Sequence, residues 1–156
     1  MGILKDNVGR EIEIRLATDE DLKRVFALVK SRDKEKSGGA PAQHYRGVPV
    51  FVAVKNGVVK GMGIAKRSGA NGILCGLYVA PAYRRAGIAR MLAVSRCALL
   101  FDSGCASVHA NIAAGNAGSE RVYVGLGFRC VGRKSRSATL RRWVATRAEF
   151  ESATKG

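Results

Sequence analysis

A strand-to-helix turn between residues 77 and 89 carries the clearest chemical signal in the sequence. An apolar strand, Leu77 to Val79, breaks at Pro81 and runs through a basic, small-residue turn into an amphipathic helix. The first amides of a helix lack partners and its dipole adds partial positive charge, so an anion is favoured there. Gly87 and Ala89 leave the backbone uncovered, which lets a diphosphate approach. On these grounds alone, an ordinary strand-to-helix connection is an equally good interpretation.

Two stretches, in the required order, resemble the GCN5-related N-acetyltransferase (GNAT) family. Arg84-x-x-Gly87-x-Ala89 resembles the acetyl-CoA pyrophosphate loop of that family, Gln/Arg-x-x-Gly-x-Gly/Ala. A later segment resembles the family pattern Asn-x-x-Ala/Ser-x-x-Leu-Tyr-x-x-x-Gly-Phe without insertion or deletion. Its matching residues are Asn116, Ser119, Val122, Tyr123, Gly127 and Phe128. Two matches in register are much less probable by chance than one.

The resemblance covers about residues 10–147 and implies an α/β (α+β) fold, a mixed central sheet of six to seven strands flanked by helices. It implies an N-acetyltransferase that moves acetyl from acetyl-CoA to a primary amine. The pantetheine arm is expected to lie beside the strand at 77–79 like an extra strand, with the diphosphate on the turn. The cofactor-binding residues implied in this way are Leu77, Tyr78, Val79, Arg84, Arg85, Ala86, Gly87, Ile88, Ala89 and Asn116.

By the same resemblance, Tyr123 lies beside the thioester sulfur, where its phenol would protonate the departing thiolate. General acid catalysis of this kind is worth about 10²–10⁴ in rate. The structural alternative for Tyr123 is an amphipathic core tyrosine. Asn116 precedes a helix and is also a candidate N-cap, while Gly127 and Phe128 fit a helix stop followed by a core aromatic.

The base that must deprotonate the attacking amine is not evident from the resemblance. Ribosomal-protein alanine acetyltransferases carry Glu at the position of Asn111, and other relatives carry Glu at the position of Ile73; neither residue is acidic here. His109 shares a strand face with Asn111 and can accept a proton near neutral pH, so it is the candidate base, with a structural histidine as the alternative. Cys75 and Cys105 are weaker candidates for an acyl-carrying nucleophile, because no basic partner is visible.

The four cysteines lack metal-site or disulfide spacing and are predicted to be buried thiols. Only two histidines are present, so no metal is predicted. The remaining cysteines and the second histidine are Cys97, Cys130 and His44.

The formal net charge of +15 predicts attraction to polyanions. Between Glu120 and Glu149 no acidic residue occurs, and this gap contains Arg121, Arg129, Arg133, Lys134, Arg136, Arg141, Arg142 and Arg147. The excess is larger than one coenzyme A needs. A second hypothesis is therefore a nucleic-acid-associated protein on the same fold, or an acetyltransferase that docks on a nucleic acid or ribosome through this basic C-terminal hairpin. Solvated surface charge is the structural alternative.

The chain has 156 residues, 47% hydrophobic and 25% charged, which suits one soluble domain at 1–150 followed by a short tail at 151–156. No apolar stretch is long enough to span a bilayer and no signal region is recognised, so a cytoplasmic location without membrane contact is expected. A homodimer is left open.

Periodicity places the elements around the turn. Alternation predicts a strand at 11–16, capping by Thr18 or Asp19 predicts a helix at 19–30, and residues 31–47 read as a loop with a short helix. Asn56-Gly57 predicts a hairpin. The remaining predicted elements are strands at 50–55, 58–67, 73–79 and 106–113, helices at 87–100 and 117–126, and two final strands.

Overall fold

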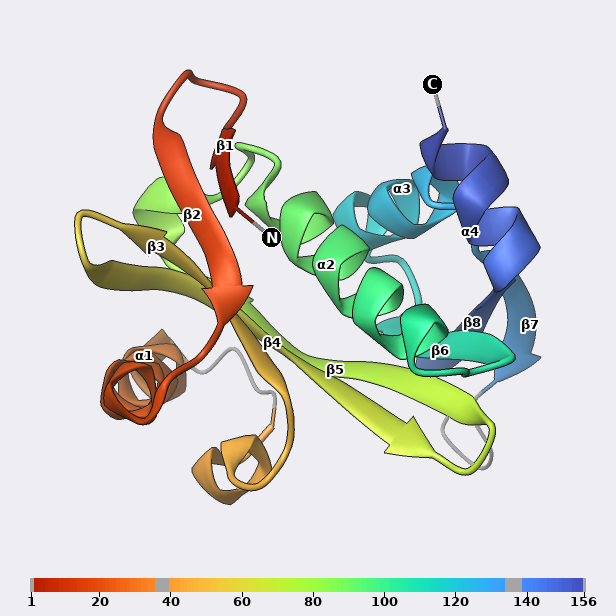
Figure 1. Ribbon diagram of the computed structural model, residues 1–156, viewed down its shortest axis with the longest axis horizontal. Coiled ribbons are helices and arrows are strands. Elements are labelled where there is room, and N and C mark those ends of the chain that lie inside the picture. The colour runs from red at the N-terminus through yellow and green to blue at the C-terminus, as the bar shows by residue number, and fades with distance from the viewer. Residues whose placement is uncertain (1, 36–39, 134–138, 156) are drawn as a thin grey trace. The chain divides into compact units, whose positions relative to one another are not determined.

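The computed structural model describes residues 2–35, 40–133 and 139–155. These residues form a mixed α/β fold (Figure 1). The strands are β1 (Gly2–Lys5), β2 (Glu11–Leu16), β3 (Val50–Lys55), β4 (Val58–Ser68), β5 (Asn71–Val79), β6 (Ser107–Ala113), β7 (Arg129–Arg133) and β8 (Leu140–Thr146). The helices are α1 (Asp19–Glu35), α2 (Ile88–Asp102), α3 (Ala117–Gly125) and α4 (Arg147–Thr154), with 3₁₀ turns η1 (Ala42–Tyr45) and η2 (Pro81–Tyr83).

The sheet is mixed, as the sequence predicts. Its hydrogen-bonded strand order is β1-β2-β3-β4-β5-β6-β8-β7. The pairs β1–β2, β2–β3, β3–β4, β6–β8 and β7–β8 are antiparallel, whereas β5 and β6 run parallel. The described residues therefore contain eight strands, one more than the six to seven predicted.

The chain divides into two compact units, which are described separately below. The first comprises Met1–Ala65 and Cys75–Arg96, and the second comprises Lys66–Leu74 and Cys97–Gly156. Strands β4 and β5 each contribute to both units. The prediction of a single domain over 1–150 stays a prediction.

In the first unit, two helices cover opposite faces of the sheet (Figure 1). Val25 and Val29 of α1 belong to a core cluster with Val52 of β3 and Met62 of β4. A Cβ atom added to Gly61 of β4 would meet Ile88 and Leu92 of α2 at 3.3 Å. Because neighbouring residues of a strand point to opposite faces, Met62 packs under α1 and Gly61 under α2.

The second unit packs helices against β6. Val108, Ala110 and Ile112 alternate along β6 and are buried. Gly72 of β5 lies under Leu100 of α2, where an added Cβ would come within 2.7 Å of the leucine side chain. That face of the second unit is thus the helix-covered one.

Three elements differ from the sequence-based expectations. β1 was not predicted because all four of its residues are exposed, so it has no alternating apolar pattern. Helix α1 continues to Glu35 through a polar last turn, in which Arg32 is buried near the Tyr45 hydroxyl. Residues 36–39 of the predicted loop lie outside the described residues, and the short helix expected within that loop is η1.

The chain end predicted as a tail from residue 151 is helical to Thr154. Helix α4 begins with a capping box, in which Thr146 accepts from the Glu149 amide and Glu149 accepts from the Thr146 amide. Phe150 of α4 packs on Phe101 of α2, with ring centroids 5.6 Å apart. Local capping defines the start of the short helix, and the aromatic contact packs it against α2.

The prediction of four buried thiols is correct for Cys97 and Cys105, whereas Cys75 is half-buried and Cys130 is exposed. The prediction is wrong for Cys130 because this residue lies on β7. In the described strand order β7 pairs only with β8 and so forms an edge of the sheet.

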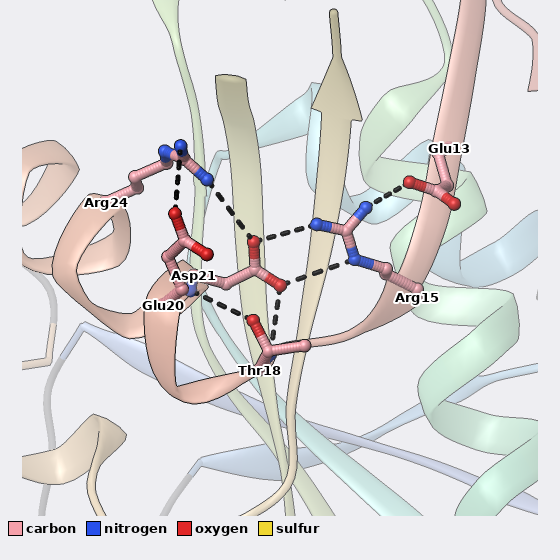
Figure 2. Close-up of polar contacts among 6 residues, drawn as sticks. All are labelled: Glu13, Arg15, Thr18, Glu20, Asp21 and Arg24. Atoms are coloured by element: carbon pink, nitrogen blue, oxygen red, sulfur yellow. Dashed lines mark hydrogen bonds and ion pairs between the residues drawn. The ribbon is translucent and has the colours of Figure 1, made fainter. Parts of the chain in front are cut away.

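A buried carboxylate joins α1 to β2 (Figure 2). Asp21 is 1% exposed, accepts from the Thr18 amide at 2.9 Å and pairs with the Arg15 guanidinium at 2.8 Å. Thr18 in turn accepts from the Asp21 amide at 3.2 Å, which caps the helix as predicted. Arg15 also pairs with Glu13, and Arg24 lies 4.0 Å from Asp21.

Burial by itself would raise the pKa of Asp21, but the Thr18 amide and the Arg15 guanidinium outweigh it and hold the pKa below its ordinary value. A carboxylate with a depressed folded-state pKa contributes stability above its unfolded pKa of about 3.9. That contribution is lost as the pH falls through the folded-state pKa.

We expect Asp21→Asn to lower the free energy of unfolding at pH 7 by about 1–3 kcal/mol, because charged hydrogen bonds are lost while the side-chain size is kept. In urea titrations at several pH values, the gap between wild type and variant should close as the pH falls below about 4. Asp19→Asn, an exposed first-turn change in the same helix, should shift stability by less than about 0.5 kcal/mol. A gap that stays constant from neutral to acidic pH would contradict this assignment.

Candidate functional site

The predicted phosphate-binding turn is a real break between β5 and α2. After η2 the backbone passes through two left-handed residues, Arg85 at φ 61° and Gly87 at φ 87°. The first helical hydrogen bond runs from the Met91 amide to the Gly87 carbonyl at 3.1 Å. The amides of residues 88–90 therefore have no acceptor inside the helix, and they stand at its positive end. This is the backbone arrangement that binds anions.

Arg84 folds back from this turn onto β5. Its Nε donates to the Val79 carbonyl at 2.9 Å and its Nη2 pairs with Glu35 of α1 at 2.9 Å. The Tyr78 hydroxyl donates to the same carboxylate, and the guanidinium lies 5.2 Å from the Tyr78 ring centroid. Burial, followed by the Glu35 carboxylate, raises the pKa of Tyr78. Glu35 was not among the predicted site residues.

The loop between β1 and β2 contacts the other side of the turn. The Asn7 amide donates to the Ala86 carbonyl at 2.8 Å, and a Cβ atom at Gly87 would lie 3.0 Å from Asn7 Oδ1. Arg10 reaches the Ala82 carbonyl and places its guanidinium 4.0 Å from the Tyr83 ring centroid. Two constraints therefore favour glycine at position 87. Its backbone is left-handed, and a Cβ atom would crowd the Asn7 side chain.

Strand β5 is paired with β6 over only part of its length. The pairs run from Asn71↔Ser107 to Leu74↔Ala110. Two residues later the chain is left-handed at Gly76, φ 66°, and the Tyr45 hydroxyl donates to the Gly76 carbonyl at 2.7 Å. Residues 77–79 lie beyond the last pair. A strand edge without a partner strand can accept an extended ligand arm through main-chain hydrogen bonds.

The second unit holds Asn116 and Tyr123. Asn116 caps α3 through its side-chain oxygen, which accepts from the Ser119 amide at 3.2 Å. Tyr123 is buried on α3, and its ring meets that of Phe128 edge-on at 5.1 Å. Gly127 is left-handed, and an added Cβ would come within 2.4 Å of the Glu149 carbonyl oxygen. The predicted cap, helix stop and core aromatic are confirmed.

His109 lies on the face of β6 opposite Val108 and Ala110. Its register neighbours are Ile73 on β5 and Val144 on β8, and its Nε2 is 3.0 Å from the Ser107 hydroxyl. Burial, and then the positive charge of Arg142, lowers the pKa of His109 below its ordinary value. Both effects favour the neutral form of the imidazole, which is the form that can accept a proton.

Asn111 and Arg142 share that face with His109. They are direct partners in the β6–β8 register. Asn111 Oδ1 and Arg142 Nε are both buried without a hydrogen-bond partner in the described part of the chain. Sequence reasoning named Asn111 only as a position where relatives carry Glu, and placed Arg142 only within the basic surface.

The predicted site residues thus fall in both units. Leu77, Tyr78, Val79 and the turn at 84–89 lie in the first, and Asn116, Tyr123 and His109 lie in the second. Within the described ranges, no group of three or more His, Cys, Asp or Glu side chains is placed to hold a metal ion. None of the helices described here combines the length and hydropathy needed to cross a membrane.

The basic C-terminal surface is only partly described, because Lys134 and Arg136 lie outside the described residues. Two of its arginines have acidic partners. Arg129 pairs with Glu149 at 3.1 Å, and Arg147 pairs with Asp102 and Glu151.

Comparison with known proteins identifies the fold. The family model described as "Acetyltransferase (GNAT) family" matches residues 14–128. The GNAT domain of an S. lividans protein called PAT superposes with a TM-score of 0.79 at 15% identity, covering 93% of this chain and 96% of that one. No curated protein matches the sequence.

Two further solved structures are similar. A ribosomal-protein-alanine N-acetyltransferase from Brucella melitensis has a TM-score of 0.68 at 24% identity, covering 85% of this chain and 98% of that chain. A Salmonella typhimurium protein solved with its cofactor acetyl-CoA has a TM-score of 0.68 at 23% identity, covering 86% and 93%. The fold predicted from the sequence is confirmed.

Proposed function

Because the chain belongs to the acetyltransferase (GNAT) family, we propose that it transfers acetyl from acetyl-CoA to a primary amine by direct nucleophilic attack. The observation that carries this proposal is the turn at 84–89, with helical amides 88–90 unpaired by the helix and a left-handed Gly87. Acetyl-CoA offers the matching groups, a diphosphate for the turn and an amide-bearing arm for the strand edge at 77–79.

In the proposed reaction the neutral amine attacks the thioester carbonyl carbon. The C–N bond forms, the C–S bond breaks, and the thiolate of coenzyme A takes a proton from Tyr123. The amine proton passes to His109, directly or through water. A neutral imidazole is suited to this role at neutral pH, and the lowered pKa of His109 supports it. Before the next turnover His109 releases its proton to solvent and Tyr123 takes one up from solvent.

The acceptor is an amine in this proposal, and a cytoplasmic location and a homodimer stay predictions. The support for an acceptor on a ribosome is the fold likeness to ribosomal-protein-alanine N-acetyltransferases. The ion pairs of Arg129 and Arg147 reduce the charge that the basic surface offers to a nucleic acid. We therefore favour the enzyme over a nucleic-acid-associated protein.

We expect Gly87→Glu to raise the Kd for acetyl-CoA at least about 100-fold, since a like charge within a few Å of a diphosphate costs several kcal/mol at an effective dielectric constant of about 20. Calorimetry measures the affinity. Gly47→Glu is the control, because Gly47 is also left-handed, φ 68°, and a side chain there meets open space. If folded wild type binds no coenzyme A, the proposed function is wrong.

We expect Tyr123→Phe to lower kcat about 100-fold or more while the Kd for acetyl-CoA stays within about threefold, because only the proton donor is removed. The phenyl ring keeps its edge-on contact with Phe128, so the melting temperature should hardly change. Steady-state kinetics with product detection by mass spectrometry gives kcat. A kcat close to that of wild type would exclude Tyr123 as the acid.

We expect wild-type kcat/KM to rise with pH through a pKa below 6.5 and to level off by pH 7, since the base must be deprotonated and the pKa of His109 is lowered. In His109→Gln this acidic limb should disappear and the plateau should fall about 100-fold. His44→Gln, at an exposed histidine in η1, serves as the control. A limb that persists in His109→Gln would assign the base to another group.

A further inference from the structure

The face of β6 and β8 that carries His109 leaves two complementary polar atoms unsatisfied. Asn111 Oδ1 is an acceptor and Arg142 Nε is a donor, and both are buried without a partner among the described residues. Leaving a buried polar group unpaired is unfavourable, so native structures keep few of them, and each one needs an explanation. Although the residues are register partners, these two atoms do not bond to each other.

The groups around these atoms specify what would satisfy them. Arg142 is a fixed cation that suits a carboxylate. Asn111 Oδ1 needs an N–H donor, and His109, two residues away on the same face, accepts a proton. Side chains opposite each other in an antiparallel pair have Cβ atoms about 4.5–5.5 Å apart. One small molecule with an amine next to a carboxylate matches this spacing.

Building on the proposed function, we propose that the acceptor is an α-amino acid, whose carboxylate binds Arg142 and whose amine is held by Asn111 and deprotonated by His109. Arg142 is then a specificity-determining residue. A bound carboxylate would also explain why a cation lies on a face where an amine must bind. Without that carboxylate, Arg142 would repel an approaching ammonium group.

Arg141 provides a matched control for this proposal. It is the next residue on β8 and its register partner on β6 is Ile112, which is buried on the helix-covered face. Its side chain thus points away from His109. Arg141→Gln and Arg142→Gln remove the same charge from opposite faces of one strand. A general electrostatic effect would respond to both changes, and a bound carboxylate only to the second.

The experiment measures acetylation of individual L-amino acids and of the corresponding α-amides by wild-type protein, with products quantified by mass spectrometry because exposed Cys130 would react with thiol reagents. We expect kcat/KM for the acid to exceed that for its amide at least 10-fold. Arg142→Gln should lower kcat/KM for the acid about 10- to 100-fold, mainly through KM, and bring the acid-to-amide ratio near one. Arg142→Lys should recover part of the loss, and Arg141→Gln should leave the ratio unchanged.

A second readout follows the pH profile. From β8 the charged group facing His109 is Arg142, while its neighbours on β5 and β6 are the uncharged Ile73 and Ser107. Removing that charge should move the acidic inflection of kcat/KM to higher pH in Arg142→Gln and leave it in place in Arg141→Gln. An unmoved inflection in Arg142→Gln would show that Arg142 does not face His109 and would overturn the inference, while the acid-to-amide ratio tests the carboxylate contact itself.

Distinct results separate this inference from the proposed function. Equal kcat/KM for acids and amides would overturn the inference and leave the acetyltransferase intact. Transfer only to peptides or to amines that lack a carboxylate would do the same. If no panel member is acetylated, the melting temperature of the coenzyme A complex is measured with each amino acid, and no increase overturns the inference. Absence of coenzyme A binding by folded wild type would instead overturn the proposed function.

Discussion

Backbone carbonyl and amide groups between Gly76 and Ile88 need hydrogen-bond partners outside the sheet and the helix. This requirement determines which side chains lie around the site. The chain supplies side-chain or loop donors to four carbonyls there: the Tyr45 hydroxyl, the Arg84 guanidinium, the Arg10 guanidinium and the Asn7 amide donate to the carbonyls of residues 76, 79, 82 and 86. All four are donors that satisfy carbonyls. The helical amides at 88–90 remain, so the unmet demand is for an acceptor, which an anionic ligand provides.

The sequence predicts those features that depend on neighbours in the chain. Alternation gives β2, Asn56-Gly57 gives the β3–β4 hairpin, and the Thr18 cap gives the start of α1, because each reflects geometry within a few residues. The Asn116 cap and the Gly127 stop are local in the same sense. The order of elements around the turn, together with the resemblance in two motifs, was therefore enough to predict the mixed sheet.

Long-range contacts explain most of what the sequence does not reveal. Asn7 reaches the turn from a loop some eighty residues earlier, and Glu35 reaches Arg84 and Tyr78 from the end of a helix whose last turn is polar. Neither contact has a periodic pattern. Helix α4 has a local signal, because Thr146 and Glu149 form a capping box that is visible in the sequence. The helix has only eight residues, however, and Phe101, which it contacts, lies forty-nine residues before Phe150.

In the proposed function, Arg142 also bears on which kind of side chain can serve as the base. Beside a guanidinium a carboxylate would pair with it, which lowers the pKa of the carboxyl and makes it a poorer proton acceptor. The same positive charge also lowers the pKa of an imidazole, because it disfavours the protonated form. An imidazole starts from an ordinary pKa near 6.5, against about 4.3 for a glutamate, so beside an arginine it remains the stronger base of the two. The residues on this face are electrostatically consistent with one another. A cation, Arg142, lies near an imidazole, His109, and the positions where relatives carry Glu hold the uncharged Asn111 and Ile73.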